Sequence, residues 1–230
     1  MPVPVLLPTT ARDEAFAAVK YHVQGELVPV LSVELSAMPI YFEHHVLLWK
    51  DPQVEIGVKA ISGAFKRMVA GMPILMTEAR GPGRIAFSRD GAGHVFGLHL
   101  SQGQSVDVRE HQFLAATESL DYGFTRIKGA SNILFGGTGF FIDKFTCRQS
   151  EGIVWLHGYG NVFEIDLKAG EQIDLEPGGW IYKDPTVQMQ TQFQKLSTGF
   201  FASGQIFWNR FTGPGRVALQ SMYFHMPTEG

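Results

Sequence analysis

Apolar and polar residues alternate along much of this chain. In residues 162–168, VFEIDLK, Phe163, Ile165 and Leu167 fall on one face and charged residues fall on the other, which is typical of a half-buried β-strand. Residues 187–194, VQMQTQFQ, show the same alternation with four glutamines on the polar face. The 26 glycines and 12 prolines favour tight turns between such runs. Together these patterns predict an all-β fold.

One stretch near the N-terminus does not alternate. Residues 10–20 read TARDEAFAAVK, in which Thr10 can cap a helix and two acidic residues fall in its first turn, where they favour the helix dipole. We therefore expect a short N-terminal helix or arm over residues 1–25.

Longer segments of the chain recur. GHVFGLHLSQGQSVDV from Gly93 aligns without a gap with GNVFEIDLKAGEQIDL from Gly160, 67 residues further on. WKDPQVEI from Trp49 likewise matches YKDPTVQM from Tyr182. Self-similarity of this kind predicts tandem structural units. No flexible linker separates the copies, so we expect one continuous body over 1–230 with approximate repeats at 26–80, 81–148 and 149–230.

A shorter sequence motif, here called the GPG phrase, recurs at about twice the 67-residue spacing. GPGRIAF begins at Gly81 and GPGRVAL begins at Gly213. Proline fixes its own φ and glycine accepts positive φ, so the phrase predicts a tight turn that leads into an apolar strand. The structural turn residues are then Gly81, Pro82, Gly83, Gly213, Pro214 and Gly215.

These motifs carry a family resemblance. The GPG turn followed by RVALQS, the preceding Phe211-Thr212, the Gly-Phe-Phe at residues 139–141 and the KDP turn resemble the altered inheritance of mitochondria protein 24 family, a mitochondrial biogenesis family with many bacterial members. Ala218 departs from the family pattern, which often has a larger residue there. The resemblance covers nearly the whole chain after residue 25. It implies three tandem copies of a small β-sandwich or short double-stranded β-helix module, like that of the tryptophan RNA-binding attenuation protein, in ring-shaped homotrimers.

Composition argues against several classes of protein, among them nucleic-acid-binding and membrane-spanning proteins. The chain has 230 residues, 45% of them hydrophobic, and a net charge of −3, so it has no excess of positive charge for a nucleic-acid backbone. No stretch approaches the ~20 apolar residues of a membrane span, and no leader segment is apparent, so we expect a cytoplasmic protein. Cys147 is the only cysteine, which excludes an intramolecular disulfide and a multi-thiolate metal site.

Candidate catalytic and metal-binding residues do not form a recognisable set. His94, His99 and His111 are the weak metal candidates. His94 and His99 are five residues apart, so on a regular strand they point to opposite faces. A β-bulge between them would restore a common face. Cys147 has no partner motif, and Asp51 and Asp184 each precede a proline, which suggests turns. We expect no cofactor and no enzyme activity.

Large rings on both faces of several strands require a second covering surface. We expect an oligomer interface at Phe140, Phe141, Phe200, Phe201 and Trp208, and the protein itself as partner, most simply in a homotrimer. Three functions remain open: a non-catalytic oligomeric β scaffold or binding protein, a cupin-like protein or enzyme that binds a small ligand or metal, and an RNA-binding ring by analogy with the attenuation protein.

Overall fold

The expected all-β fold is confirmed. The computed structural model of the protein describes residues 3–7, 13–16, 18–60, 75–127, 140–198 and 202–222. Apart from one turn of 3-10 helix, η1 (His44–Val46), the regular elements within these ranges are all β-strands. No helix in this described part of the chain is long and apolar enough to cross a membrane.

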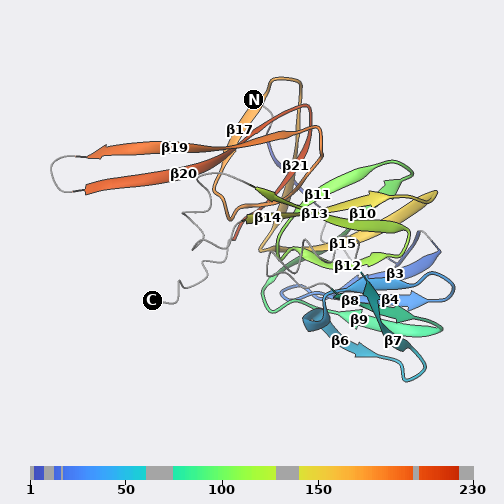
Figure 1. Cartoon of the computed structure of the whole chain (residues 1–230). Coiled ribbons are helices and arrows are strands. Elements are labelled where there is room, and N and C mark those ends of the chain that lie inside the picture. The colour runs from blue at the N-terminus through green and yellow to red at the C-terminus, as the bar shows by residue number, and fades with distance from the viewer. Residues whose placement is uncertain are drawn as a thin grey trace.

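The strands form four antiparallel sheets (Figure 1). The seven-stranded sheet has the order β1 (Val5–Leu6), β16 (Val162–Leu167), β21 (Gly215–Gln220), β18 (Trp180–Lys183), β11 (Ser105–Arg109), β14 (Phe140–Cys147), β13 (Leu120–Ile127). The six-stranded sheet has the order β10 (Gly93–Ser101), β15 (Glu151–Tyr159), β12 (Phe113–Thr117), β5 (Ile40–Phe42), β8 (Leu75–Arg80), β7 (Glu55–Ala60). The five-stranded sheet has the order β2 (Asp13–Phe16), β3 (Val19–Gln24), β4 (Val30–Leu35), β9 (Gly83–Phe87), β6 (Leu47–Lys50). The three-stranded sheet has the order β17 (Gln172–Leu175), β20 (Ala202–Thr212), β19 (Gln188–Thr198).

The predicted N-terminal helix is wrong. β2 and β3 instead form an antiparallel hairpin, with Ala18 at a positive φ of 58° in its turn. Val19 and Tyr21 are buried while the residues beside them are more exposed, and the Tyr21 ring packs edge-on against Trp155 with centroids 5.3 Å apart. Burial of alternate residues thus outweighs a weak helical preference. Thr10, the expected cap, lies outside the described residues.

Three interior strands, β9, β15 and β21, have comparable neighbours in their sheets. β9 lies between β4 and β6, β15 between β10 and β12, and β21 between β16 and β18. The second pairing of each set contains a register shift, at Leu47/Trp49, Phe113/Ala115 and Trp180/Tyr182. β8, β14 and β20 lie between β5 and β7, β11 and β13, and β17 and β19. Two further pairings, β5 with β12 and β11 with β18, join these groups.

Each GPG phrase connects two strands that follow one another along the chain and lie in different sheets. Residues 81–83 link β8 to β9, and residues 213–215 link β20 to β21. Gly83 has a φ of 136° and Gly215 a φ of 129°, a region that residues with a Cβ rarely adopt. The phrases therefore need glycine at these positions.

Near the start of β9, β15 and β21, one backbone N–H group is held by a side chain at or just after the end of the strand beside it. Three backbone N–H groups donate in this way: Arg84 to Asp51 Oδ2 at 2.9 Å, Arg216 to Asp184 Oδ2 at 2.9 Å, and Ile153 to Thr117 Oγ1 at 3.0 Å. The guanidinium groups of both arginines also contact these carboxylates. The hydrogen bond from the Arg84 backbone lowers the pKa of Asp51. The two aspartates of the KDP turns are therefore structural anchors for the GPGR phrases.

Apolar side chains between the sheets form three clusters. One centres on the aromatic residues Phe113, Phe145 and Tyr182, and a second on Phe42, Phe87 and Trp155. A smaller cluster contains Trp180, Phe211 and Val217. Burial of large side chains of this kind contributes about 1.5–3 kcal/mol each, so the sheets are fixed to one another mainly by aromatic packing.

Candidate functional site

The three candidate histidines have different surroundings. His94 is buried next to Phe96, whereas the exposed His99 stacks on Phe16 with centroids 4.0 Å apart. The register of β10 against β15 runs without a shift from Gly93 to Ser101, so the two imidazoles lie on opposite faces of the strand. His111 lies in the turn after β11 with a φ of 70°. Among the described residues, no group of three His, Cys, Asp or Glu side chains could hold a metal ion.

Cys147 is held inside the fold. Its side chain is 1% exposed, and its thiol donates to the carbonyl oxygen of Gln149 at 3.3 Å. Burial raises the pKa of the thiol, which disfavours the nucleophilic thiolate. The arrangement gives Cys147 a packing role.

Sequence reasoning missed a buried polar cluster around His157. This imidazole is fully buried in β15, and burial together with the positive charge of Arg89 lowers its pKa to about 4. Arg89 is itself buried and donates to the carbonyl oxygen of Phe113 at 3.1 Å. Both amide atoms of Gln112, also in the cluster, lack a hydrogen-bond partner among the described residues. A single histidine within the apolar run of residues 153–159 was the only available signal.

This cluster predicts acid sensitivity. Because the pKa of His157 is about 4 in the folded state and about 6.5 in an unfolded chain, the unfolded state binds more protons between these two values. The free energy of unfolding should therefore have its full value above pH 6.5. It should fall by up to about 3 kcal/mol as the pH approaches 4. Urea denaturation at fixed protein concentration across this range measures the effect. His157→Gln should flatten the slope, with exposed His45→Gln as the control for loss of an imidazole; an unchanged slope in His157→Gln would contradict the assignment.

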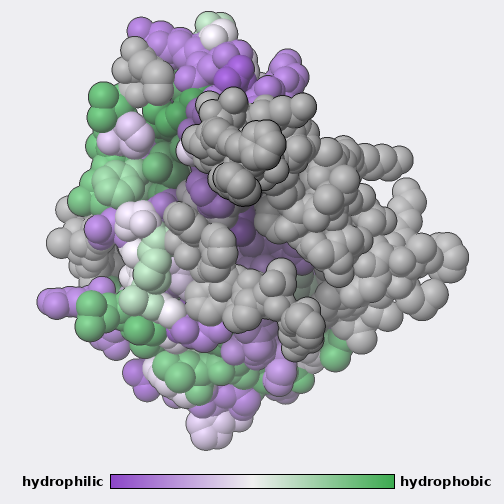
Figure 2. Space-filling model, turned by 90° about the vertical axis from the view of Figure 1, so that its left-hand side faces the viewer, coloured by the Kyte–Doolittle hydropathy of each residue, from purple (hydrophilic) through white to green (hydrophobic). Residues whose placement is uncertain are grey.

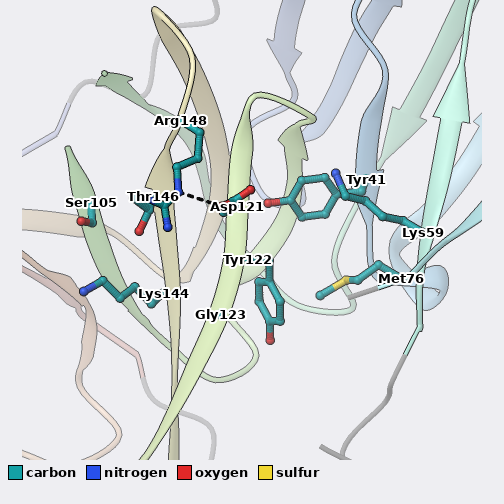
Figure 3. A pocket seen from close by; sticks show the side chains of 10 residues that line it. All are labelled: Tyr41, Lys59, Met76, Ser105, Asp121, Tyr122, Gly123, Lys144, Thr146 and Arg148. Atoms are coloured by element: carbon teal, nitrogen blue, oxygen red, sulfur yellow. Dashed lines mark hydrogen bonds and ion pairs between the residues drawn. The ribbon is translucent and has the colours of Figure 1, made fainter. Parts of the chain in front are cut away.

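A cavity of about 580 Å³ lies between β7 and β8 on one side and β11, β13 and β14 on the other. Figure 3 shows its lining residues: Tyr41, Lys59, Met76, Ser105, Asp121, Tyr122, Gly123, Lys144, Thr146 and Arg148. The Lys59 amine lies 4.3 Å from the centre of the Tyr41 ring, and burial lowers its pKa. Arg148 is engaged with Asp121 at 2.8 Å. Lys144 points away from Lys59 (Figure 3), so the basic groups do not converge on one point.

Two of the edge strands, β6 and β17, correspond to strands that are paired on both sides elsewhere in the described part of the chain. β6 is the last strand of the five-stranded sheet, and β17 is the last strand of the three-stranded sheet; Figure 1 places them at opposite ends of the molecule. β6 exposes two apolar side chains, Leu48 at 55% and Trp49 at 40%. β12 and β18, which lie beside β15 and β21 as β6 lies beside β9, are buried throughout. The edge of β6 therefore presents surface that is covered in its counterparts.

The edge of β17 is partly apolar and carries one carboxylate, that of Asp174, which is held by an arginine. Ile173 and Leu175 are half-buried. Between them, Asp174 accepts two hydrogen bonds from Arg210, both at 2.7 Å. The Arg210 guanidinium lowers the pKa of Asp174. This edge therefore presents a carboxylate that is held in its ionised form.

Other apolar side chains are also exposed. They include Leu27 at 76% and Val58 at 67%, and Figure 2 shows apolar side chains gathered mainly along the left-hand side of one face. Among the residues expected at an oligomer interface, Trp208 is half-buried in β20. Phe140 and Phe141 begin β14, but their side chains, like Phe200 and Phe201 entirely, lie outside what the structure describes. The sequence argument for those residues stays a prediction.

Comparison with known proteins relates the chain to a protein family and to solved structures. The model of a family described as mitochondrial biogenesis AIM24 matches residues 21–222. The crystal structure of protein SPYM3_0169 from Streptococcus pyogenes superposes with a TM-score of 0.67 at 18% identity, covering 89% of this chain and 94% of the other. That identity supports likeness of fold alone. No protein with curated annotation matches the chain.

Proposed function

We propose, on the premise that this chain belongs to the mitochondrial biogenesis AIM24 family, that it is a non-catalytic β scaffold of three pseudo-equivalent units that assembles into a ring of three copies. The groups most capable of chemistry have structural partners: Asp51 and Asp184 hold the GPGR phrases, and Cys147 is buried. These contacts support a structural role.

Recurrent strand pairing supports the three units. Six strands in the same order make the same four pairings in each of three segments, which span residues 30–87, 93–159 and 162–220. These limits differ from the 26–80, 81–148 and 149–230 expected from sequence, because β9 and β15 complete a unit by pairing backwards with β4 and β10. The backbone hydrogen bonds to Asp51, Thr117 and Asp184 recur at matching places.

One observation supports the assembly. Neighbouring units pair in the same way at two places inside the chain, and the first and last units each keep one strand that could form the same pairing with another copy. Each internal junction pairs the second strand of one unit with the third strand of the next, as β5 with β12 and β11 with β18. The third strand of the first unit, β6, and the second strand of the last unit, β17, have no such partner among the described residues. An exposed edge of this kind favours association, and head-to-tail contacts can close a ring.

The alternatives have less support. A small-ligand site would need polar groups that converge in one cavity, and those of the cavity in Figure 3 do not. An RNA-binding ring would need a recurring basic stripe. The recurring arginines, Arg84 and Arg216, are instead engaged with Asp51 and Asp184, and Ile153 takes the equivalent place in the middle unit.

Light scattering after size-exclusion chromatography tests the proposal. The chain has a mass of 25.5 kDa, and at micromolar concentration the wild-type protein should elute with the mass of three chains. A single species of 25.5 kDa over the accessible concentration range would overturn the assembly and leave the three units as a monomeric fold.

A further inference from the structure

We infer that copies of this chain meet by pairing β6 of one copy with β17 of the next, in antiparallel register, with Lys50 opposite Asp174 and Trp49 opposite Leu175. This inference rests on the proposed self-assembly and specifies the surface that performs it. Its partner is a second copy of the same chain.

The internal junction between the second and third units supplies the template. There Asp107 of β11 lies opposite Lys183 of β18, and Val108 lies opposite Tyr182. The Lys183 amine donates to Asp107 Oδ2 at 2.7 Å and to the carbonyl oxygen of Val187 at 3.0 Å. The junction therefore combines strand pairing with a nearly buried ion pair.

Strand register places Lys50 where Lys183 stands in that template. Lys183 of β18 lies opposite Val217 of β21, and Lys50 of β6 lies opposite Ile85 of β9. Each lysine amine also lies near the carbonyl oxygen of the aspartate that follows it, at 3.5 Å for Lys183 and 3.4 Å for Lys50. Lys50 therefore occupies the place of a junction lysine, and no carboxylate from another unit lies opposite it in the part of the chain that the structure describes.

The same comparison places Asp174 where Asp107 stands. Asp107 of β11 lies opposite Lys144 of β14, and Asp174 of β17 lies opposite Arg210 of β20. A carboxylate can accept about four hydrogen bonds, so Asp174 keeps acceptor capacity beyond the two that Arg210 donates. The two open edges thus carry the two halves of the ion pair seen between Asp107 and Lys183.

The exposure of β6, compared with that of β12 and β18, supports this pairing. Leu114 and Ala115 of β12, and Ile181 and Tyr182 of β18, are all 0% exposed at the internal junctions. Their counterparts in β6, Leu48 and Trp49, are 55% and 40% exposed. Pairing β6 with β17 would also join β4-β9-β6 to β17-β20-β19, which gives the strand order that the two internal junctions already have.

Disulfide trapping tests the register. Directly opposite residues of antiparallel strands have Cα atoms 4.5–5.5 Å apart, which suits a disulfide, so Trp49→Cys combined with Leu175→Cys should give covalent species of three chains on mild oxidation. Leu48→Cys with Leu175→Cys is the control, because a shift of one residue moves the side chain to the other face. Each single variant controls for the buried Cys147. Assembly at the wild-type mass without this crosslink, or with equal crosslinking in the control, would overturn the inference while leaving the scaffold proposal intact.

A charge variant provides the second measurement, for the case in which the cysteine pair prevents assembly. Lys50→Glu places a carboxylate opposite Asp174 and should raise the apparent dissociation constant of the assembly at least tenfold. Lys168→Glu, on an exposed turn, is the matched control and should leave it unchanged. Equal behaviour of the two variants would overturn the inferred pairing, whereas a monomeric wild-type protein would remove the proposed assembly itself.

Discussion

Trp49→Asp should convert the assembled protein into folded monomers. The Trp49 side chain is 40% exposed at the edge of β6, so an aspartate there remains solvated in the separate chain and should leave its fold intact. In the assembly, however, the change removes a large apolar contact, worth about 1.5–3 kcal/mol, and places an unpaired carboxylate in a buried position. Since 1.4 kcal/mol corresponds to a factor of ten, we expect the dissociation constant to rise at least about a hundredfold.

Light scattering over a dilution series measures this effect, with circular dichroism to establish that the variant is folded. Leu27→Asp is the matched control, because that side chain is also exposed, at 76%, but lies in the turn between β3 and β4. A Trp49→Asp protein that keeps the wild-type mass and dissociation constant would show that the edge of β6 is not the contact.

Lys183→Ala should have the largest effect on stability. The side chain of Lys183 is 8% exposed and that of its partner Asp107 is 17% exposed, with 2.7 Å between their charged atoms. Removal of one partner leaves a carboxylate nearly buried without its cation, which typically costs 3–5 kcal/mol. Because this pair retains some exposure, we expect the free energy of unfolding to fall by about 3 kcal/mol.

Urea denaturation at one fixed protein concentration gives the comparison, since assembly makes apparent stability depend on concentration. Exposed Lys168→Ala should change the free energy of unfolding by no more than about 0.5 kcal/mol. The double variant Asp107→Asn with Lys183→Met should recover part of the loss, because it leaves neither charge unpaired. A loss below about 1 kcal/mol in Lys183→Ala would mean that the ion pair contributes little to the junction between units.

Local patterns predicted the all-β class and several strands, but not how the strands pair. Alternation in residues 162–168 and 187–194 identified β16 and β19, because one face of each strand meets a core and the other meets polar surroundings. Alternation cannot say which edge of a strand finds which neighbour. The pairing of β9 with β4, which precedes it by about 50 residues, is one example that alternation could not predict.

The N-terminal segment shows why a short local pattern can mislead. Residues 10–20 were expected to form a helix, yet residues 13–16 and 19–24 form a hairpin. The reason is that Val19 and Tyr21 are buried against strands far along the chain. His157 was overlooked for a related reason. A lone histidine within an apolar run has no periodic signature, and its lowered pKa arises from burial and from Arg89, 68 residues away in sequence.

The sequence does not distinguish the exposed edge strand β6 from its buried counterpart β18. Trp49-Lys50 and Tyr182-Lys183 align as equivalents, but only the structure distinguishes the exposed Trp49 from the buried Tyr182. Adjacent large rings, such as Phe140 and Phe141, predict a second covering surface because they place apolar residues on both faces of a strand. The exposure of a single tryptophan on a short edge strand cannot be predicted until the neighbouring strands are known.

Amide hydrogen exchange at the two open edges tests the central claim most directly. If copies join through β6 and β17, peptides that cover residues 47–50 and 172–175 should be protected in the wild-type protein to a similar degree as those of β12 and β11. They should lose that protection in Trp49→Asp, while β12 and β11 keep theirs. Rapid exchange at both edges in the wild-type protein, at a concentration where light scattering finds three chains, would place the contact elsewhere and contradict head-to-tail closure.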